Sequence, residues 1–159
     1  MDLSSTTVKR LTHLDARGEL NMVDVSGKPV LLREATARGE IRLQKPTLKL
    51  IQKQAIAKGN VLASARLAGI LAAKKTGELI PLCHPLNLTH CEVQFEIPKS
   101  QDRIVIYAST KIAAQTGVEM EALTAVSIAA LTIYDMCKAV DKTMRITEIC
   151  LLSKTKKSA

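Results

Sequence analysis

The chain has 159 residues, 47% of them hydrophobic, which suits one domain with a core and would leave two domains cramped. Aromatic residues make up only 2%, which disfavours nucleic-acid modules in which bases stack on Phe, Tyr or Trp. The net charge of +8 attracts anions, whether nucleic acid, anionic lipid or small phosphates, and does not choose among them. No apolar run approaches the roughly 18 residues of a membrane span, so we expect a cytoplasmic protein with no membrane partner.

Composition divides the chain into three parts. A polar stretch rich in Thr, Asp, Arg and Gly predicts a flexible N-terminal arm over residues 1–20. Apolar periodicity then predicts a single domain over residues 21–154, which carries the candidate catalytic residues. Three lysines within the last six residues predict a solvated basic tail over residues 155–159.

The predicted order of elements is strand, two helices, two strands, helix and strand. This order suits a ferredoxin-like α+β fold, in which helices pack on one face of an antiparallel sheet. Asn60 is placed to cap the second helix and Gly77 to close it. The predicted ranges are a strand over 30–43, helices over 45–57 and 61–75, strands over 89–97 and 103–108, a helix over 117–140 and a strand over 144–153.

The helix over 117–140 has apolar residues all around it. Such a helix is buried on every side, and one small domain has difficulty covering it. We therefore expect a homo-oligomer with a subunit interface along this helix.

The segment Pro81–Pro85, followed by His90 and Cys91, contains two cysteines and two histidines. Zinc is disfavoured, because His90 and Cys91 are adjacent on a strand and point to opposite faces, and the spacing does not match usual zinc ligands. Cys83 and Cys91 are equally explained as small buried side chains. His84 lies in a loop that Pro85 holds extended, where it serves either a structural or a proton-transferring role.

The segment Thr116–Glu121 begins the long helix. Thr116 and Glu119 have the spacing of a capping box, which would give Glu119 a structural role. The start of a helix also favours anions. Glu121 is not needed for the cap, and a carboxylate one turn into an apolar helix requires a partner or a chemical role.

Asp135 and Lys138 lie three residues apart near the other end of this helix and share a face. They are either a surface ion pair of little energetic weight or, among apolar neighbours, partly desolvated groups whose pKa values are shifted for proton transfer. Fourteen residues separate Glu121 from Asp135, or about 21 Å of helix. One small ligand cannot touch both in one chain, so a shared site would join two subunits.

Basic residues are scattered along the chain, at Lys28, Arg33, Lys58, Lys138 and Lys154 among others. Most lysines and arginines are solvated, but Lys58 stands beside Gly59 at a junction of two helices. The glycine-rich patterns of P-loops and dinucleotide-binding folds are absent from the sequence.

Four segments closely resemble the family of cyclic pyranopterin monophosphate synthases, the MoaC family. They are Met22–Ser26, Leu79–Leu86, Thr116–Thr124 and Leu131–Val140, and the similarity extends from about Leu11 to Lys154. The resemblance implies a ferredoxin-like hexamer, a trimer of dimers with active sites at the dimer interfaces. It also implies a lyase of molybdenum cofactor biosynthesis that converts (8S)-3',8-cyclo-7,8-dihydroguanosine 5'-triphosphate to cyclic pyranopterin monophosphate and releases pyrophosphate.

The resemblance implies roles for individual residues as well. The proton transfers of this reaction require no redox cofactor, and we expect neither a resident cofactor nor a metal site, since the sequence offers no ligand set for an Mg²⁺ that could accompany the pyrophosphate. Two departures from the family are Asn60, where an Asp is common, and a tail without the usual glycines. The implied catalytic residues are Asp135, Lys138, Lys58 and His84, and the implied substrate-binding residues are Leu82, Cys83, His84, Glu119, Met120, Glu121, Arg33 and Lys154.

Two other classes of protein stay open at this point. A nucleic-acid-binding module would bind with a steep salt dependence, although the aromatic or Arg-rich stripes typical of such modules are missing from the sequence. A purely structural assembly protein would tolerate the loss of Asp135 and Lys138 without any catalytic effect.

Overall fold

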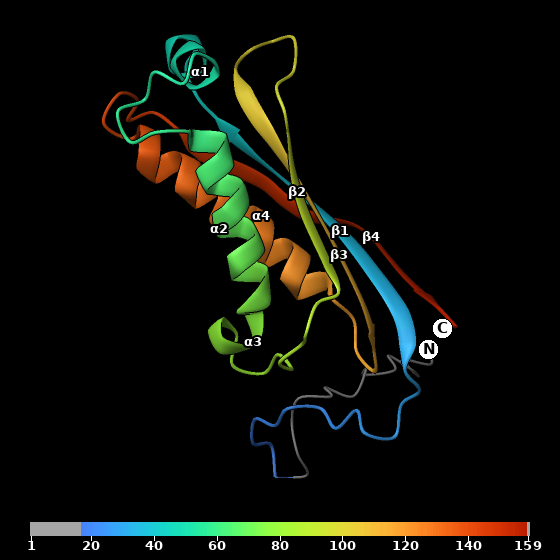
Figure 1. Ribbon diagram of the computed structural model, residues 1–159. Coiled ribbons are helices and arrows are strands. Elements are labelled where there is room, and N and C mark those ends of the chain that lie inside the picture. The colour runs from blue at the N-terminus through green and yellow to red at the C-terminus, as the bar shows by residue number, and fades with distance from the viewer. Residues whose placement is uncertain (1–16, 159) are drawn as a thin grey trace, which may run out of the picture.

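The computed structural model describes residues 17–158, so most of the predicted arm lies outside the described residues. A four-stranded sheet and a layer of helices make up the fold (Figure 1). The elements are β1 (Leu31–Arg42), α1 (Lys45–Gln52), α2 (Val61–Lys74), α3 (Thr76–Leu79), β2 (His90–Glu96), β3 (Arg103–Ala114), α4 (Glu119–Cys137) and β4 (Arg145–Lys157).

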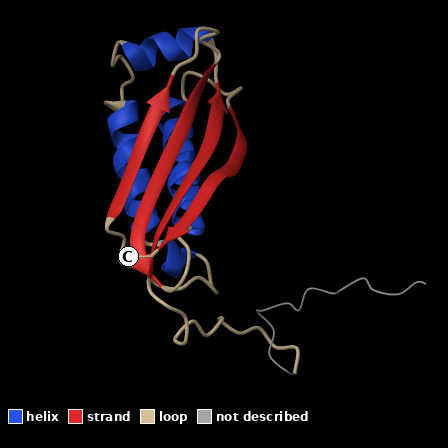
Figure 2. Ribbon diagram, turned by 90° about the vertical axis from the view of Figure 1, so that its right-hand side faces the viewer, coloured by secondary structure: helices blue, strands red, loops and turns tan. Residues whose placement is uncertain are grey.

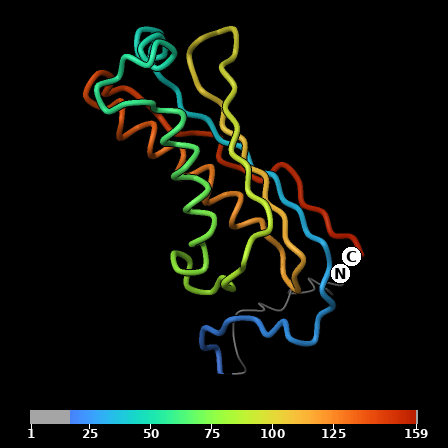
Figure 3. The backbone as a smooth tube through the Cα atoms, viewed as in Figure 1, coloured from blue at the N-terminus to red at the C-terminus, as the bar shows by residue number. Residues whose placement is uncertain are grey.

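The sheet has the strand order β2-β3-β1-β4, and every neighbouring pair is antiparallel. The helices cover one face of this sheet and leave the other face open (Figure 2). This confirms the predicted α+β class and the antiparallel sheet with helices on one face. The start of β1 lies beside the end of β4, so residues far apart in the sequence meet there (Figure 3).

The core is aliphatic, because aromatic residues make up only 2% of the chain. Alternate residues of β1 face the helices, and Ala35, Ala37 and Ile41 are fully buried there. Gly39 belongs to the same row, and a Cβ at that position would lie 2.5 Å from Cγ1 of Val126. A side chain would therefore push α4 away from the sheet.

Several boundaries differ from the sequence predictions. α1 ends at Gln52 instead of continuing to about residue 57, because Gln54 takes a left-handed backbone (φ 52°) and the amide of Ala55 donates back to the carbonyl of Leu50. Asn60 caps α2 as predicted, since its side chain accepts from the amide of Ala63 at 3.0 Å. Gly77 does not close α2 but lies inside the short helix α3.

β3 and β4 are both longer than predicted. β3 continues to Ala114 because it pairs with β1 along its whole length. β4 continues to Lys157, which lies opposite Leu32 of β1. The first three residues of the predicted tail, 155–157, therefore belong to the sheet, although their side chains are exposed.

α4 packs against α2 and the sheet, but its start is not capped as predicted. Val118 occupies the N-cap position without a side-chain hydrogen bond, so the predicted capping box is wrong. α4 has 19 residues and a mean hydropathy of 1.3, which is enough by length and composition to span a membrane, contrary to the sequence expectation. Half of this stretch is buried inside the fold.

Candidate active site

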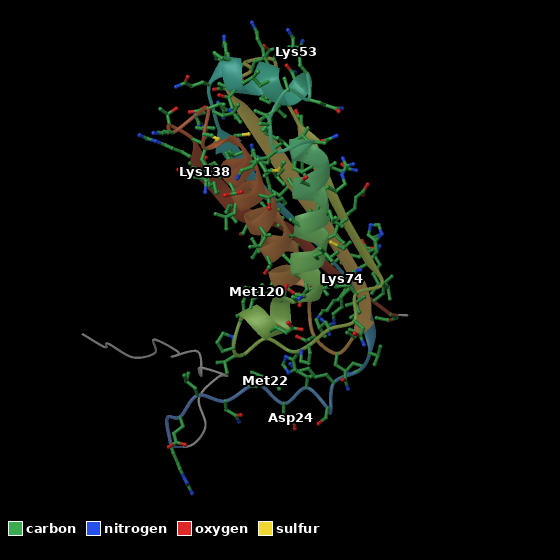
Figure 4. The ribbon with its side chains drawn as sticks, turned by 60° about the vertical axis from the view of Figure 1, so that its left-hand side comes forward. Met22, Asp24, Lys53, Lys74, Met120 and Lys138 are labelled. Atoms are coloured by element: carbon green, nitrogen blue, oxygen red, sulfur yellow. The ribbon has the colours of Figure 1, made fainter. Side chains whose placement is uncertain are left out.

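A cleft of about 370 Å³ lies at the start of α4. Its walls come from the loop after α3, the segment before β1 and the first turn of α4. All six residues predicted for this end of the helix line it, namely Leu82, Cys83, His84, Glu119, Met120 and Glu121. Figure 4 shows Met22 and Asp24 beneath this end of the molecule, on the same side as Met120.

His84 ties two walls of the cleft together. Its Nε2 lies 2.8 Å from the carbonyl oxygen of Val23, and because a carbonyl only accepts, Nε2 carries the hydrogen. In the neutral ring Nδ1 is then a free acceptor. His84 therefore positions the segment before β1 and keeps one nitrogen for a ligand.

Glu121 is the buried carboxyl of the cleft, with only 3% of its surface exposed. Burial raises its pKa to about 7, and the nearby charge of Glu119 adds to this shift. Burial and the charge of Glu121 in turn raise the pKa of the Cys83 thiol. Glu121 can therefore take up or release a proton near neutral pH.

A second, basic pocket of about 240 Å³ adjoins the cleft and shares Gly117 and Glu119 with it. Arg33 and Lys154 both line this pocket, as predicted. Nζ of Lys154 lies 3.0 Å from Oε1 of Glu119. The guanidinium of Arg33 donates from Nε to the carbonyl of Ala114 at 2.9 Å and from Nη2 to that of Gln115 at 3.0 Å. Arg33 thus holds the loop that leads into α4.

The other three predicted catalytic residues form an ion cluster at the far end of α4. Nζ of Lys58 lies 2.7 Å from Oδ2 of Asp135, and Nζ of Lys138 lies 2.8 Å from Oδ1. The two lysines lower the pKa of Asp135 to about 2, and Asp135 raises the pKa of Lys138.

Of the two alternatives for Asp135 and Lys138, the single chain has the surface ion pair and not the partly desolvated groups. Both side chains are 56% exposed, because they lie on the outer side of the last turn of α4, whose inner side carries the buried Met136 and Cys137. The pKa of Lys138 is accordingly raised by its carboxylate partner and not lowered by burial.

The predicted residues therefore form two groups at opposite ends of α4. Figure 4 shows Met120 and Lys138 far apart along this helix. The separation agrees with the expectation that one ligand cannot touch Glu121 and Asp135 of the same chain. Among residues 17–158, no cluster of three or more His, Cys, Asp or Glu side chains is arranged to hold a metal ion.

Some lining residues were missed at the sequence level. Val23, Val25 and Lys28 line the cleft together with Thr116 and Gly117. The segment Met22–Ser26 is one of the four motifs that resemble the family, so its place in the sequence was a usable signal for the two valines. Lys28 was noted only as one of many basic residues.

A sequence profile of the MoaC family matches residues 22–157, which include both pockets and the ion cluster. The chain belongs to the MoaC family. This confirms the resemblance drawn from the four motifs. Among its relatives, the cyclic pyranopterin monophosphate synthase of Chloroflexus aurantiacus is 61% identical to this MoaC-family chain, over 91% of this chain and 88% of the relative.

Two further relatives carry the same name. The synthase of Parvibaculum lavamentivorans is 56% identical over 92% of both chains. Cyclic pyranopterin monophosphate synthase 1 of Mycobacterium tuberculosis is 58% identical over 91% of this MoaC-family chain and 85% of the relative. The family profile, over residues 22–157, covers every helix and strand of the fold.

Proposed function

We propose that this chain is a cyclic pyranopterin monophosphate synthase, a lyase of molybdenum cofactor biosynthesis. Its substrate would be the cyclised dihydro-GTP, and its products cyclic pyranopterin monophosphate and pyrophosphate. The observation that carries the proposal is the joined pair of pockets at the start of α4. One holds a buried carboxyl and a histidine, and the other is lined by Arg33 and Lys154.

The two pockets suit the two parts of such a substrate. The cleft takes the ring system, where Glu121 exchanges a proton near neutral pH and His84 offers Nδ1. The basic pocket takes the triphosphate, whose negative charge increases on the leaving pyrophosphate. Leu82, Cys83 and Met120 supply the less polar wall against which the rings pack.

The ion cluster of Lys58, Asp135 and Lys138 completes the active site from a second subunit. Within one chain it lies at the wrong end of α4 to reach the cleft. At a subunit interface, the start of α4 in one subunit would lie beside the end of α4 in its neighbour. The two lysines and the carboxylate of the neighbour would then reach the substrate. Assembly of the two subunits would also shield the ion cluster from water, and its electrostatic interactions would become stronger there.

The assembly we propose is a hexamer, a trimer of dimers with active sites at the dimer interfaces. Support comes from large apolar side chains that are exposed along α4 and the edge strand β4. Leu131 is 53% exposed on the outer side of α4. The others on these two elements are Met120, Ile149, Leu151 and Leu152.

We also propose a ferredoxin-like fold, a cytoplasmic location and no resident cofactor. The order β2-β3-β1-β4 with two long helices on one face supports a ferredoxin-like fold. The enzyme would act in the cytoplasm, where its thiols stay reduced. No resident cofactor is needed, and Mg²⁺ would accompany the leaving pyrophosphate as its counter-ion.

The test is to mix the purified protein with the cyclised dihydro-GTP. Stoichiometric release of pyrophosphate together with cyclic pyranopterin monophosphate supports the proposal. The Asp135→Asn variant is the control for a contaminating activity. Intact substrate after many hours, with tight and salt-sensitive binding to nucleic acid, would instead support the nucleic-acid module.

A further inference from the structure

Lys156 lies near the end of β4, directly opposite Arg33 of β1. It lines the basic pocket together with Arg33 and Lys154. It also lines an adjoining pocket of about 320 Å³, which it shares with Lys28 and Arg33. It does not line the cleft that holds Glu121. Lys156 therefore lies in the basic groove that adjoins the ring-binding cleft and outside the cleft itself.

The charges around Lys156 are already engaged, while its own ammonium is not. Arg33 donates to two backbone carbonyls, and Lys154 pairs with Glu119. The second carboxylate of the pocket, Glu34, pairs with Lys111 at 3.0 Å. Within the described part of the chain, the side chain of Lys156 makes no hydrogen bond or ion pair.

Two cations that face each other across neighbouring strands repel. Arg33 and Lys156 are such a pair, and no carboxylate within the described residues neutralises either of them. An anion bound between them would relieve the repulsion, and the phosphate oxygens of a polyphosphate chain fit this charge. The pairing of β1 with β4 thus builds a cationic wall from residues at opposite ends of the sequence.

We propose that Lys156 binds the phosphates of the substrate that lie farthest from its ring system. This inference rests on the proposed function, because the ligand is taken to be a nucleoside triphosphate derivative. Lys156 belongs to residues 155–159, which composition alone predicts to be a solvated tail, and the inference assigns it a binding role. Lys156 acts as a binding residue, and the proton transfers stay with the groups around the ring.

Lys157 provides a matched control. It is the next residue on the same strand, so its side chain points to the opposite face of the sheet. It lies opposite Leu32 and lines none of the three pockets described above. Replacing either lysine by Ala removes one charge from the same exposed strand, but only Lys156→Ala removes it from the groove.

The experiment measures the binding of inorganic pyrophosphate, GMP, GDP and GTP by calorimetry at fixed salt. The Lys156→Ala variant should bind GTP and pyrophosphate about fivefold to twentyfold more weakly, the range expected for an exposed charge-assisted hydrogen bond. Its affinity for GMP should stay within about twofold. Lys157→Ala should bind all four probes like the wild type, and Lys156→Arg should recover most of the lost affinity. Circular dichroism and sedimentation verify that each variant keeps its fold and assembly.

Equal affinities for Lys156→Ala and Lys157→Ala would overturn the inference, and so would a wild-type protein that binds neither pyrophosphate nor GTP. A separate turnover assay tells this failure apart from failure of the proposed function. Turnover of the cyclised nucleotide with unchanged affinities in Lys156→Ala rejects only the role of Lys156. Loss of affinity in Lys156→Ala, with no turnover by the wild type, keeps the polyphosphate site and rejects the proposed reaction.

Discussion

Glu121 and Asp135 are both carboxyl groups of α4, but their surroundings shift their pKa values in opposite directions. Burial raises the pKa of Glu121 to about 7. Two lysines lower the pKa of Asp135 to about 2. At neutral pH Asp135 is therefore a fixed negative charge, and Glu121 is the carboxyl that can carry a proton. Such a divergence assigns different chemical roles to two groups of the same type.

The first prediction concerns the stability of the Glu121→Gln variant. The folded-state pKa of about 7 lies above the ordinary value of 4.5, so the folded chain binds more protons between these two pH values. The wild type therefore loses stability as the pH rises from about 4.5 through 7. Relative to Glu121→Gln, it should lose on the order of 1–3 kcal/mol between pH 5 and pH 8.

Urea unfolding at both pH values, at one protein concentration, measures this difference. Glu148→Gln, which removes an exposed carboxylate of β4, is the control and should follow the wild type. A gap between wild type and Glu121→Gln that is the same at pH 5 and pH 8 would show that Glu121 is not protonated near neutral pH.

The second prediction concerns the ion cluster. Asp135→Asn keeps the shape of the side chain but removes the charge that pairs with Lys58 and Lys138. We expect turnover to fall by about 10²–10⁴-fold, the range for loss of a positioned acid–base group. Steady-state pyrophosphate release measures it, with Lys142→Ala as a control at a nearby exposed lysine. A loss smaller than about fivefold would reduce the cluster to a surface ion pair.

At the scale of elements, Gly69 sets the distance between α2 and α4. A Cβ at this position would lie 2.9 Å from the carbonyl oxygen of Ala125 and 3.2 Å from Cγ2 of Val93. A backbone carbonyl inside a helix cannot move aside without shifting α4. The close packing of the two helices therefore requires glycine here.

The third prediction is that Gly69→Ala destabilises the fold. Alanine adds up to about 1 kcal/mol of helix propensity, but overpacking costs about 1–3 kcal/mol, so we expect a net loss. Gly27→Ala is the control, since a Cβ there meets nothing within 4 Å. Thermal or urea unfolding measures both variants. A Gly69→Ala protein more stable than the wild type would mean that the two helices are free to separate.

The fourth prediction follows from α4 as a connector between two half-sites. Glu121→Ala and Asp135→Asn should each be inactive, but each chain keeps one intact end of the helix. After dissociation and reassembly of an equal mixture, roughly a quarter of two-chain sites combine both intact ends. Pyrophosphate release should recover toward that fraction. A mixture that exchanges subunits yet stays inactive would show that the two ends do not share a site.

For the whole molecule, the decisive feature is the apolar surface that one chain leaves uncovered along α4 and β4. Our fifth prediction is that the wild type sediments well above its chain mass of 17.3 kDa at micromolar concentration. Leu131→Glu should shift it toward smaller species and lower turnover in parallel, because a charge would be buried at the interface. A wild-type protein that is monomeric and fully active would show that the active site does not require a second subunit.

Much of this molecule could be predicted from local patterns. The alternation at residues 89–97 predicted β2 to within one residue at each end, and Asn60 caps α2 as expected. The residues of the cleft stand in three separate motifs that resemble the family, so the resemblance and not a local pattern grouped them. The spacing of Glu121 and Asp135 also predicted two separate ends, because a helix converts residue number directly into distance.

Other features depended on contacts between distant parts of the chain. The predicted capping box is wrong because α4 begins at Glu119 with Val118 at the N-cap, and the carboxylate of Glu119 pairs instead with Lys154 of β4. The ion cluster likewise needs Lys58, which the fold brings from the segment before α2 to Asp135.

The sequence by itself determined the order of the strands and of the longer helices and the aliphatic core, since these depend on composition, periodicity and short-range spacing, and the resemblance to the family supplied most residues of the cleft. Only the tertiary structure decided which charges meet. The pairing of β1 with β4 brings Arg33 beside Lys154 and Lys156, residues separated by most of the chain. No local pattern encodes such a pairing, because it forms only when the whole sheet is assembled.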